Sequence, residues 1–271
     1  MSATEDAPLP VDETVVAAFE ADGAAVLRGA FGDWIGTLRA GVARNMAAPS
    51  GDVRIYDGGS GRFFGDYCNW QRIPEYEDFI RHSPAAAIAQ RLMGSRRVRL
   101  FHEHVLVKEP GADVPTPWHQ DQPYYCVDGA QSCSLWIPLD PVDRATSPEF
   151  VAGSHRWGRF FRPERFDKTP LNEGDGLDAV PDIDAHRDAY RVLGWSLEPG
   201  DAIAFTFRTV HGAPANRRQD RARRAFSLRV VGEDATFARR PGVTSPPFRD
   251  VTLAHGAPLE GPDFPLLVGS Y

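Results

Sequence analysis

A histidine and an aspartate stand two residues apart near the middle of the chain and could bind one metal ion together. They are His119 and Asp121, within the segment 116–125. Side chains two apart in an extended strand point to the same face, so this spacing predicts an imidazole and a carboxylate aimed at one point. With a second imidazole, the pair would form the two-histidine, one-carboxylate site that holds Fe(II) with open coordination positions. Alone, a short His-x-Asp sequence is more typical of a surface histidine beside a solvated aspartate, so the rest of the chain has to support the metal site.

The third ligand is expected to be a histidine later in the chain. The candidates are His155, His186, His211 and His255. We favour His211, because it ends a predicted strand beside a turn rich in glycine and proline, where a ligand is held rigidly. His155 lies in a predicted turn, and His186 and His255 lie in polar loops.

The segment 223–231 alternates as a strand does, and its two faces differ in chemistry. One face is mostly apolar and is expected to pack on helices: Arg224, Phe226, Leu228 and Val230. The other face has small residues between two guanidinium groups: Arg223, Ala225, Ser227 and Arg229. An arginine there could bind a carboxylate through two parallel hydrogen bonds. The alternation alone also allows these arginines to be solvated charges on an edge strand.

The elements that would position these residues follow from periodicity and end signals. Helices are expected over 12–23, with Asp12 as N-cap and Gly23 as stop, over 33–46 and over 83–92. Strands are expected over 24–27, 98–108, 132–139, 203–207 and 223–231. Segments 47–80 and 156–190 are expected to be long loops, and residues 1–11 a flexible tail. Helices followed by strands indicate one α+β domain over residues 1–271 with a closed or two-sheet β core.

The composition excludes several classes of function. The net charge of −7, with acids and bases mixed, argues against nucleic acid or anionic membranes as partners. There is no apolar stretch of the roughly 20 residues that a membrane span needs. Three cysteines without a CxxC spacing, and an N-terminus without a secretory pattern, favour the cytoplasm. A small-molecule substrate is therefore expected, while the sequence leaves the oligomeric state open.

Taken together, these motifs resemble the phytanoyl-CoA dioxygenase family of Fe(II)- and 2-oxoglutarate-dependent oxygenases. The resemblance covers about residues 12–235 and rests on Trp118-His-Gln-Asp121, Trp136-Ile-Pro-Leu139, Gly153-Ser-His-Arg-Trp157, Gly200-Asp201 and His211-Gly-x-x-x-Asn216. It implies a double-stranded β-helix (cupin-like jelly roll) core with N-terminal helices packed on one sheet. It also implies Fe(II) on His119, Asp121 and His211, with 2-oxoglutarate and molecular oxygen as cosubstrates. The implied reaction hydroxylates an unactivated C–H bond and converts 2-oxoglutarate to succinate; the presence of Asp121 favours this over halogenation.

The resemblance further implies an arginine that binds the far carboxylate of 2-oxoglutarate. The family position, eleven residues after the second histidine, is Ala222 here, so we assign Arg223 across one extra loop residue, with Arg224 as the alternative. Ala213 stands where the family often has a serine that binds the same carboxylate. Thr116 or Ser227 is expected to compensate, Trp136 to wall the cosubstrate pocket, and Lys108 to lie at its mouth or in solvent.

The sequence also allows two alternative functions. His102-Glu-His104 could be the metal pair of a different cupin metalloenzyme, and Ala213 with the shifted arginine leaves room for an inactive or metal-free binding protein. The substrate is not specified. Candidate substrate lids are segment 56–76, Tyr124 with Tyr125, and segment 156–190. Arg62, Arg72 and Arg229 could meet an anionic substrate or be ordinary strand and surface charges.

Overall fold

Four helices precede most of the strands in the computed structural model, which describes residues 9–164, 169–172 and 176–270. They are α1 (Glu13–Asp22), α2 (Ile35–Ala47), α3 (Pro74–His82) and α4 (Ala85–Met93). The Asp12 side chain accepts a hydrogen bond from the Val15 N–H at 2.9 Å, and Gly23 ends α1 with φ of 77°, as the sequence predicted. Residues 1–8 of the expected tail lie outside the described residues.

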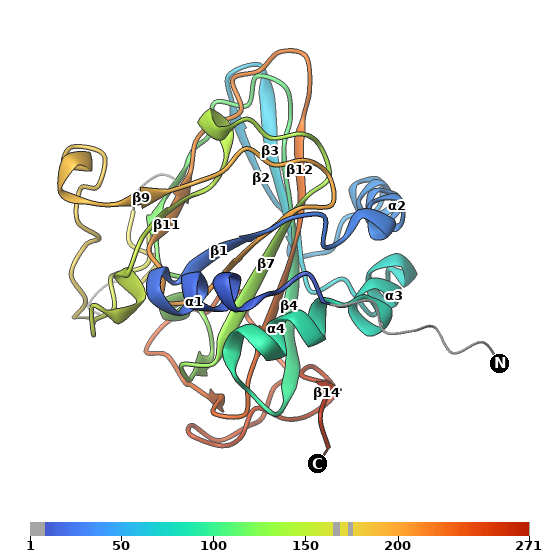
Figure 1. Cartoon of the computed structure of the whole chain (residues 1–271), viewed down its shortest axis with the longest axis vertical. Coiled ribbons are helices and arrows are strands. Elements are labelled where there is room, and N and C mark those ends of the chain that lie inside the picture. Colours follow the sequence, from blue (N-terminus) through green and yellow to red (C-terminus); the bar gives the residue numbers. More distant parts are fainter. Residues whose placement is uncertain (1–8, 165–168, 173–175, 271) are drawn as a thin grey trace.

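A large antiparallel sheet forms the centre of the molecule. Its strands, in spatial order, are β1 (Ala24–Leu27), β10 (Ala202–Phe205), β7 (Ser132–Pro138), β12 (Arg223–Val231), β4 (Val98–Lys108), β3 (Gly61–Tyr67) and β2 (Arg54–Gly58), while β14 (Leu266–Val268) pairs with β4. Helices α2 and α3 lie on the side of this sheet away from β9 and β11 (Figure 1). The expected packing of helices on one sheet is therefore confirmed.

A smaller sheet faces the other side of the large one. It consists of β5 (Thr116–His119), β11 (His211–Ala213), β8 (Glu149–Val151) and β9 (Val192–Leu193), and a separate pair joins β6 (Val127–Asp128) to β13 (Thr236–Phe237). Short 3₁₀ turns cover Gly32–Trp34, Gln122–Tyr124, Arg144–Thr146, Ser154–Arg156 and Arg187–Ala189. Two antiparallel sheets facing each other form the jelly roll that the resemblance implied.

The two faces of β12 separate the apolar core from the interior cavity. Phe226 packs against the rings of Tyr76, at 4.9 Å between centroids, and Phe79, at 5.4 Å, both on α3. Leu228 and Val230 join the same core of buried residues. Arg223 and Arg229 point to the opposite side and line the cavity between the sheets. The predicted alternation of this strand is confirmed.

The expected loop over 47–80 is wrong, because this segment forms a β-hairpin and a helix. Strands β2 and β3 pair from Arg54↔Gly65 to Gly58↔Gly61, and α3 follows. Two features hid β3 from a period-two search. Gly61 and Gly65 contribute no side chain to the pattern, and four of the other five positions in β3 are buried, on both faces of the strand.

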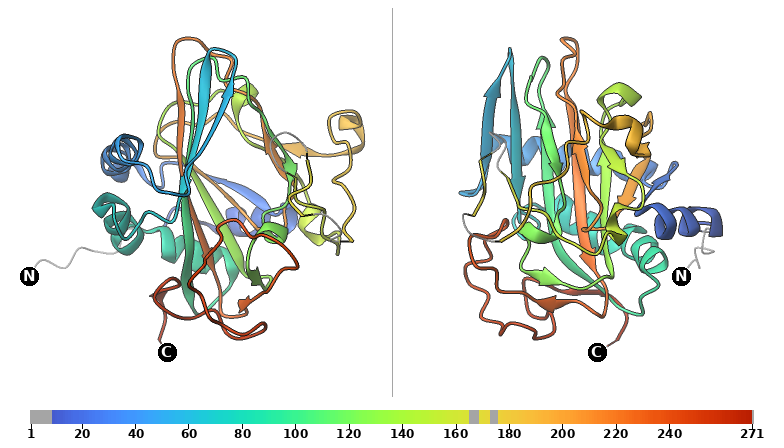
Figure 2. Two further views of the ribbon diagram at one scale, coloured as in Figure 1. Left: turned by 180° about the vertical axis from the view of Figure 1, so that it is seen from behind. Right: turned by 90° about the vertical axis from the view of Figure 1, so that its left-hand side faces the viewer.

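The C-terminal part of the chain after β12 folds back over one end of the sheets. Figure 2 shows this segment, in red, looping beneath the lower ends of the central strands. None of the helices among the described residues is long and apolar enough to cross a membrane.

Candidate active site

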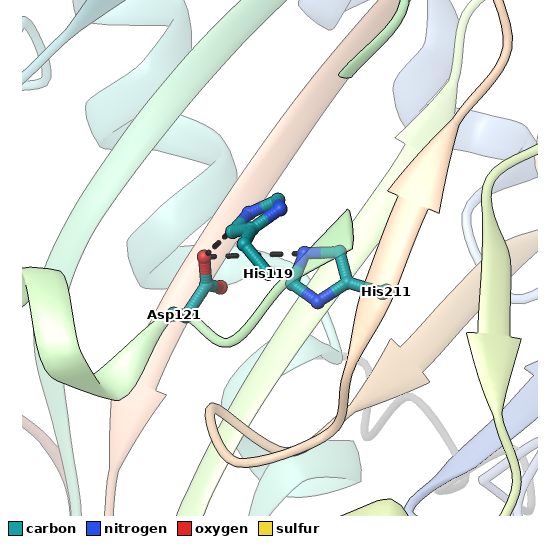
Figure 3. Close-up of side chains that lie close together, drawn as sticks. All are labelled: His119, Asp121 and His211. Atoms are coloured by element: carbon teal, nitrogen blue, oxygen red, sulfur yellow. Dashed lines mark ion pairs between the residues drawn. The ribbon is translucent and has the colours of Figure 1, made fainter. Parts of the chain in front are cut away.

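Two histidines and an aspartate meet inside the jelly roll, on the side of the cavity formed by the small sheet. His119 ends β5 and pairs with His211, the first residue of β11. The Oδ1 atom of Asp121 lies 3.6 Å from His119 Nε2 and 3.9 Å from His211 Nε2 (Figure 3). The three potential ligand atoms lie within 4.8 Å of one another, and this is the one such group among the described residues.

The local geometry of the His-x-Asp pair differs from the expected strand. Asp121 has φ of −73° and ψ of −42° and begins the 3₁₀ turn Gln122–Tyr124, so the pair does not lie on one extended strand. The turn after β5 brings the carboxylate beside the imidazole instead. The prediction that the two side chains lie side by side is correct, but its reason, strand alternation, is wrong.

Backbone carbonyl groups orient both imidazoles. His119 Nδ1 lies 2.8 Å from the Pro117 oxygen, and His211 Nδ1 lies 2.9 Å from the Thr209 oxygen. A carbonyl only accepts, so each Nδ1 donates this hydrogen bond, and each Nε2 is left facing Asp121 as the atom that a metal ion would bind. Burial lowers the pKa of His211 to about 3, which keeps this imidazole neutral at ordinary pH.

Asp121 is a buried carboxylate that remains ionised. Burial by itself raises its pKa, but the positive charge of the neighbouring Arg229 outweighs burial and lowers the pKa below its usual range. Arg229 Nε lies 3.6 Å from Asp121 Oδ2. Two imidazoles and one carboxylate are the donor set that divalent iron takes in non-haem oxygenases, so these residues fit that ion.

A cavity of about 620 Å³ extends from this triad in both directions between the sheets. Its volume is in the range of pockets that hold small organic molecules. Of the residues that the sequence singled out for the site, those that line the cavity are Lys108, Thr116, His119, Asp121, Trp136, His211 and Arg223. Ser227 is fully buried beside it but does not line it.

Two cations meet at one end of the cavity. Arg223 donates hydrogen bonds to the carbonyl oxygens of Thr146 and Pro214, and Lys108 Nζ donates to the same Pro214 oxygen at 3.0 Å. Lys108 is 1% exposed, so its expected place at a pocket mouth or in solvent is wrong. Burial and the neighbouring Arg223 lower the pKa of Lys108 well below its usual value. The two side chains have neutral oxygens as their hydrogen-bond partners and would gain from an anion between them.

Arg223 and Arg224 are adjacent in β12, so their side chains point to opposite faces of the sheet. Arg224 points out of the cavity, where its guanidinium binds Asp140 at 2.6 and 2.9 Å.

Ala213 pairs with Thr116 across β11 and β5, so the threonine is the hydroxyl residue placed beside the position where the family often has a serine. The buried hydroxyl of Ser227 has no hydrogen-bond partner among the described residues.

The remaining histidines lie apart from the triad. His155 contacts the Glu20 carbonyl at 3.1 Å, and His255 accepts a hydrogen bond from the Arg239 N–H at 3.2 Å. His102 and His104 do line the cavity from β4, as their shared strand face predicted. No third ligand joins these two among the described residues.

Several cavity residues were missed by sequence reasoning. Phe150 stacks on the His211 ring at 5.7 Å between centroids, and Phe205 lies 4.6 Å from the same ring. Segment 243–247 also lines the cavity, and its Ser245 N–H donates to the Tyr124 carbonyl at 2.9 Å. The prolines of this segment signalled a loop, but nothing in the sequence placed that loop over the cavity.

The three predicted lid segments each reach the cavity in part. The residues that do so are Tyr56, Phe63, Gly65 and Tyr67, then Tyr124 and Tyr125, then Glu164 and Leu171. Residues 165–168 and 173–175 of the third segment lie outside the described residues. Arg62 and Arg72 do not line the cavity, since Arg62 pairs with Glu109 at 2.8 Å and Arg72 with Asn69 at 2.6 Å.

A jelly roll that encloses two histidines and a carboxylate, with a cationic pair at one end of its cavity, defines the class of non-haem iron oxygenases that use 2-oxoglutarate. Comparison with known proteins gives the family. The phytanoyl-CoA dioxygenase family model matches residues 19–225, so the chain belongs to this family. The resemblance to this family that the sequence motifs indicated is thereby confirmed.

Individual relatives are distant. A probable phytanoyl-CoA dioxygenase from Caenorhabditis elegans is 24% identical over 168 residues, which are 59% of this chain and 52% of that protein. This match therefore spans about half the length of the curated relative.

Solved structures of similar fold cover nearly the whole chain. The α-ketoglutarate-dependent carbocyclase SnoK from nogalamycin biosynthesis aligns with TM-score 0.74 and 24% identity, over 95% of this chain and 97% of its own. The epimerase SnoN, solved with Fe3+, α-ketoglutarate and nogalamycin RO, aligns with TM-score 0.71 and 25% identity, over 94% and 98%. Both similarities agree with the jelly-roll fold, and the SnoN structure, which holds Fe3+ and α-ketoglutarate, agrees with iron and 2-oxoglutarate as the cofactors.

Proposed function

We propose that this chain forms one oxygenase domain that binds Fe(II) through His119, Asp121 and His211 and uses 2-oxoglutarate to hydroxylate a small molecule. The observation that carries the proposal is the convergence of two histidine imidazoles and one aspartate carboxylate inside a cavity of suitable size. When bound, the iron with 2-oxoglutarate and oxygen supplies the oxidising power to break a C–H bond, with decarboxylation to succinate.

Each cavity residue has a definite part in this proposal. Arg223 binds the far carboxylate of 2-oxoglutarate, and Lys108, 3.0 Å from the carbonyl that Arg223 also contacts, adds a second donor. Thr116 supplies a hydroxyl where Ala213 cannot. Trp136, with Phe150 and Phe205, walls this end of the cavity and excludes water from it.

The outcome of the oxidation is proposed from the ligand set. Asp121 occupies the carboxylate position, which favours hydroxylation over halogenation. The similarity to a carbocyclase and an epimerase also supports oxidative ring closure as a second candidate. An assay that follows both succinate and the substrate's mass separates it from hydroxylation, because hydroxylation adds one oxygen atom and ring closure removes two hydrogens.

We propose the cytoplasm as the location, since Cys68, Cys126 and Cys133 are all free thiols.

The proposal is tested by anaerobic titration of the apo-protein with Fe(II) and 2-oxoglutarate, following the visible metal-to-ligand charge-transfer absorption of the chelate. Wild-type protein should develop this band. Asp121→Ala should abolish it through loss of iron, and Arg223→Gln should demand more 2-oxoglutarate to reach it.

Two other results would contradict the proposed function, each in favour of a different alternative. Iron binding without the band would contradict the 2-oxoglutarate assignment and favour a metalloenzyme that uses His102 and His104. Failure to bind iron at all would favour a binding protein that keeps the fold without the metal.

A further inference from the structure

Arg229 is a buried cation in the cavity that faces the Asp121 carboxylate, and the proposed reaction gives it no role in binding the substrate. It lies on the same face of β12 as Arg223, six residues further along, and is 5% exposed. Six residues of strand separate the two backbone positions by about 20 Å. Arg229 therefore lies toward the other end of the cavity, near Asp121 and away from the cationic pair of Arg223 and Lys108.

Much of the hydrogen-bonding capacity of Arg229 is unfilled. Its Nε and Nη1 atoms make no hydrogen bond among the described residues. Its one ion pair within the described part of the chain is with Asp121 Oδ2, at 3.6 Å, which is too long for a hydrogen bond. Leaving charged N–H groups buried without acceptors is costly, so the arrangement favours an acceptor that arrives from the cavity.

The charges around the cavity point to an anion as that acceptor. Five cationic side chains line the cavity, Arg54, Lys108, Arg223, Arg229 and Arg249, and Arg249 is paired with Asp52. The carboxylates that line it are Asp121 and Glu164, and Glu164 is beside Arg162 at 3.7 Å. A divalent iron and a 2-oxoglutarate dianion cancel each other. An excess of positive charge therefore persists after both bind, even if Lys108 is neutral.

The neighbours of Arg229 complete a site for the polar end of a ligand. His102 pairs with Arg229 across β4 and β12. Its Nδ1 donates to the Glu103 carbonyl at 3.1 Å, so its Nε2 is an acceptor, and that atom is buried with no partner among the described residues. The Tyr125 ring lies 5.9 Å from the Arg229 guanidinium carbon. Aromatic side chains continue the wall toward the opening, namely Tyr67, Tyr124 and Tyr56.

We propose that the substrate of this site is a small organic acid, whose carboxylate binds Arg229 and whose apolar or aromatic body lies against the tyrosines. His102 Nε2 accepts a hydrogen bond from an O–H or N–H group close to that carboxylate, which favours hydroxy and amino acids over unsubstituted ones. This inference deepens the proposed function and rests on it, because it places the substrate in the same cavity as the iron and 2-oxoglutarate.

The test compares matched carboxylates and amides, so that charge changes while shape is kept. The probes are benzoate, phenylacetate, mandelate and hydrocinnamate, each with its amide. Binding is measured by calorimetry under anaerobic conditions, on protein loaded with Fe(II) and 2-oxoglutarate and on the apo-protein. We expect wild-type protein to bind at least one acid about tenfold or more tightly than its amide, as a charge-assisted bond provides, and mandelate more tightly than phenylacetate.

Three variants separate substrate binding from a structural role. Arg229→Gln should lose the preference for acids, and Arg229→Lys should keep part of it. Arg62→Gln is the matched control, because Arg62 is an exposed arginine outside the cavity, and it should behave as wild type.

The charge-transfer band of each variant shows whether the iron site is intact. Equal binding of acids and amides by wild-type protein, or no binding of any acid, would overturn the inference. An undiminished acid preference in Arg229→Gln would overturn it as well. If wild-type protein fails to form the charge-transfer band, the proposed function fails, and acid preference in the apo-protein still decides the role of Arg229.

Discussion

At the scale of single residues, orientation decides which of two adjacent arginines can act. Arg223 and Arg224 have the same chemistry, and the spacing from His211 fits neither perfectly. Arg223 points into the cavity beside Lys108, whereas Arg224 points out to Asp140. The two positions therefore form a matched pair in which only the direction of the side chain differs.

We predict that Arg223→Gln raises the dissociation constant of 2-oxoglutarate by about 10- to 100-fold, because it removes a charged donor to the far carboxylate. Arg224→Gln should leave this constant within about threefold of wild type, since a loss below 1 kcal/mol is expected far from the ligand. Titration of the visible band measures both. An equal effect of the two changes would contradict the assignment of Arg223.

Glu103 is a second residue whose environment sets its behaviour. It is fully buried on the helix side of β4, where Oε1 accepts a hydrogen bond from the Asn69 N–H at 2.5 Å. Its Oε2 has no partner among the described residues. Burial raises the pKa of this carboxyl to about 8. Its folded form therefore holds a proton that the unfolded chain has already released at neutral pH.

This shift predicts how stability depends on pH. The contribution of Glu103 is fully present below the unfolded pKa and is lost as pH rises through the folded pKa of about 8. Between the unfolded and the folded pKa of Glu103, each pH unit lowers the free energy of unfolding by up to about 1.4 kcal/mol. Glu103→Gln should remove this loss, so its free energy of unfolding should fall less than that of wild type between about pH 5 and about pH 8. Parallel slopes in urea unfolding of the two proteins would contradict it.

At the scale of elements, β12 joins the structural core to the site. It pairs with β4 along one edge and with β7 along the other, over most of its length. Its outer side chains pack under α3, and its inner side chains include both cavity arginines. The packing of the outer face therefore fixes where Arg223 and Arg229 point.

We predict that Phe226→Ala destabilises the protein by about 3–5 kcal/mol, because it opens a cavity beneath the rings of Tyr76 and Phe79. Ile55→Ala on the edge strand β2, where the side chain is 47% exposed, is the control. It should change stability by less than about 0.5 kcal/mol. Urea unfolding measures both, and a loss of similar size in the two variants would refute the packing argument.

At the scale of the whole molecule, the metal ligands come from segments that only the folded chain brings together. His119 and Asp121 precede His211 by about ninety residues, and they meet because β5 pairs with β11 in the small sheet. Ligands that bind across such a site bind the folded state alone, so they stabilise it by mass action.

We predict that Fe(II) and 2-oxoglutarate together raise the melting temperature anaerobically. At about 100 times the dissociation constant, the gain is about 2.7 kcal/mol. For a chain of this size that corresponds to about 5–10 °C. Asp121→Ala should show little of this shift in the same thermal scan, and chelation of the iron should reverse it in wild-type protein. A full shift in Asp121→Ala would place the metal elsewhere.

The sequence by itself determined those features that depend on neighbours along the chain. Strand alternation separated the two faces of β12 and β4, capping residues marked α1, and the His-x-Asp spacing with a distant histidine indicated the iron-binding family. Local patterns carry this information because side-chain direction within one strand or helix follows from backbone geometry.

Tertiary structure alone decided the contacts across the cavity. Pairing of β12 with β4 put Arg229 beside His102, and the turn after β5 put Asp121 near Arg229. Segment 243–247 came to lie over the cavity through its contact with Tyr124, and Lys108 became buried rather than solvated. Such contacts join residues far apart in the chain, and they depend on how whole sheets pack, which no local pattern encodes.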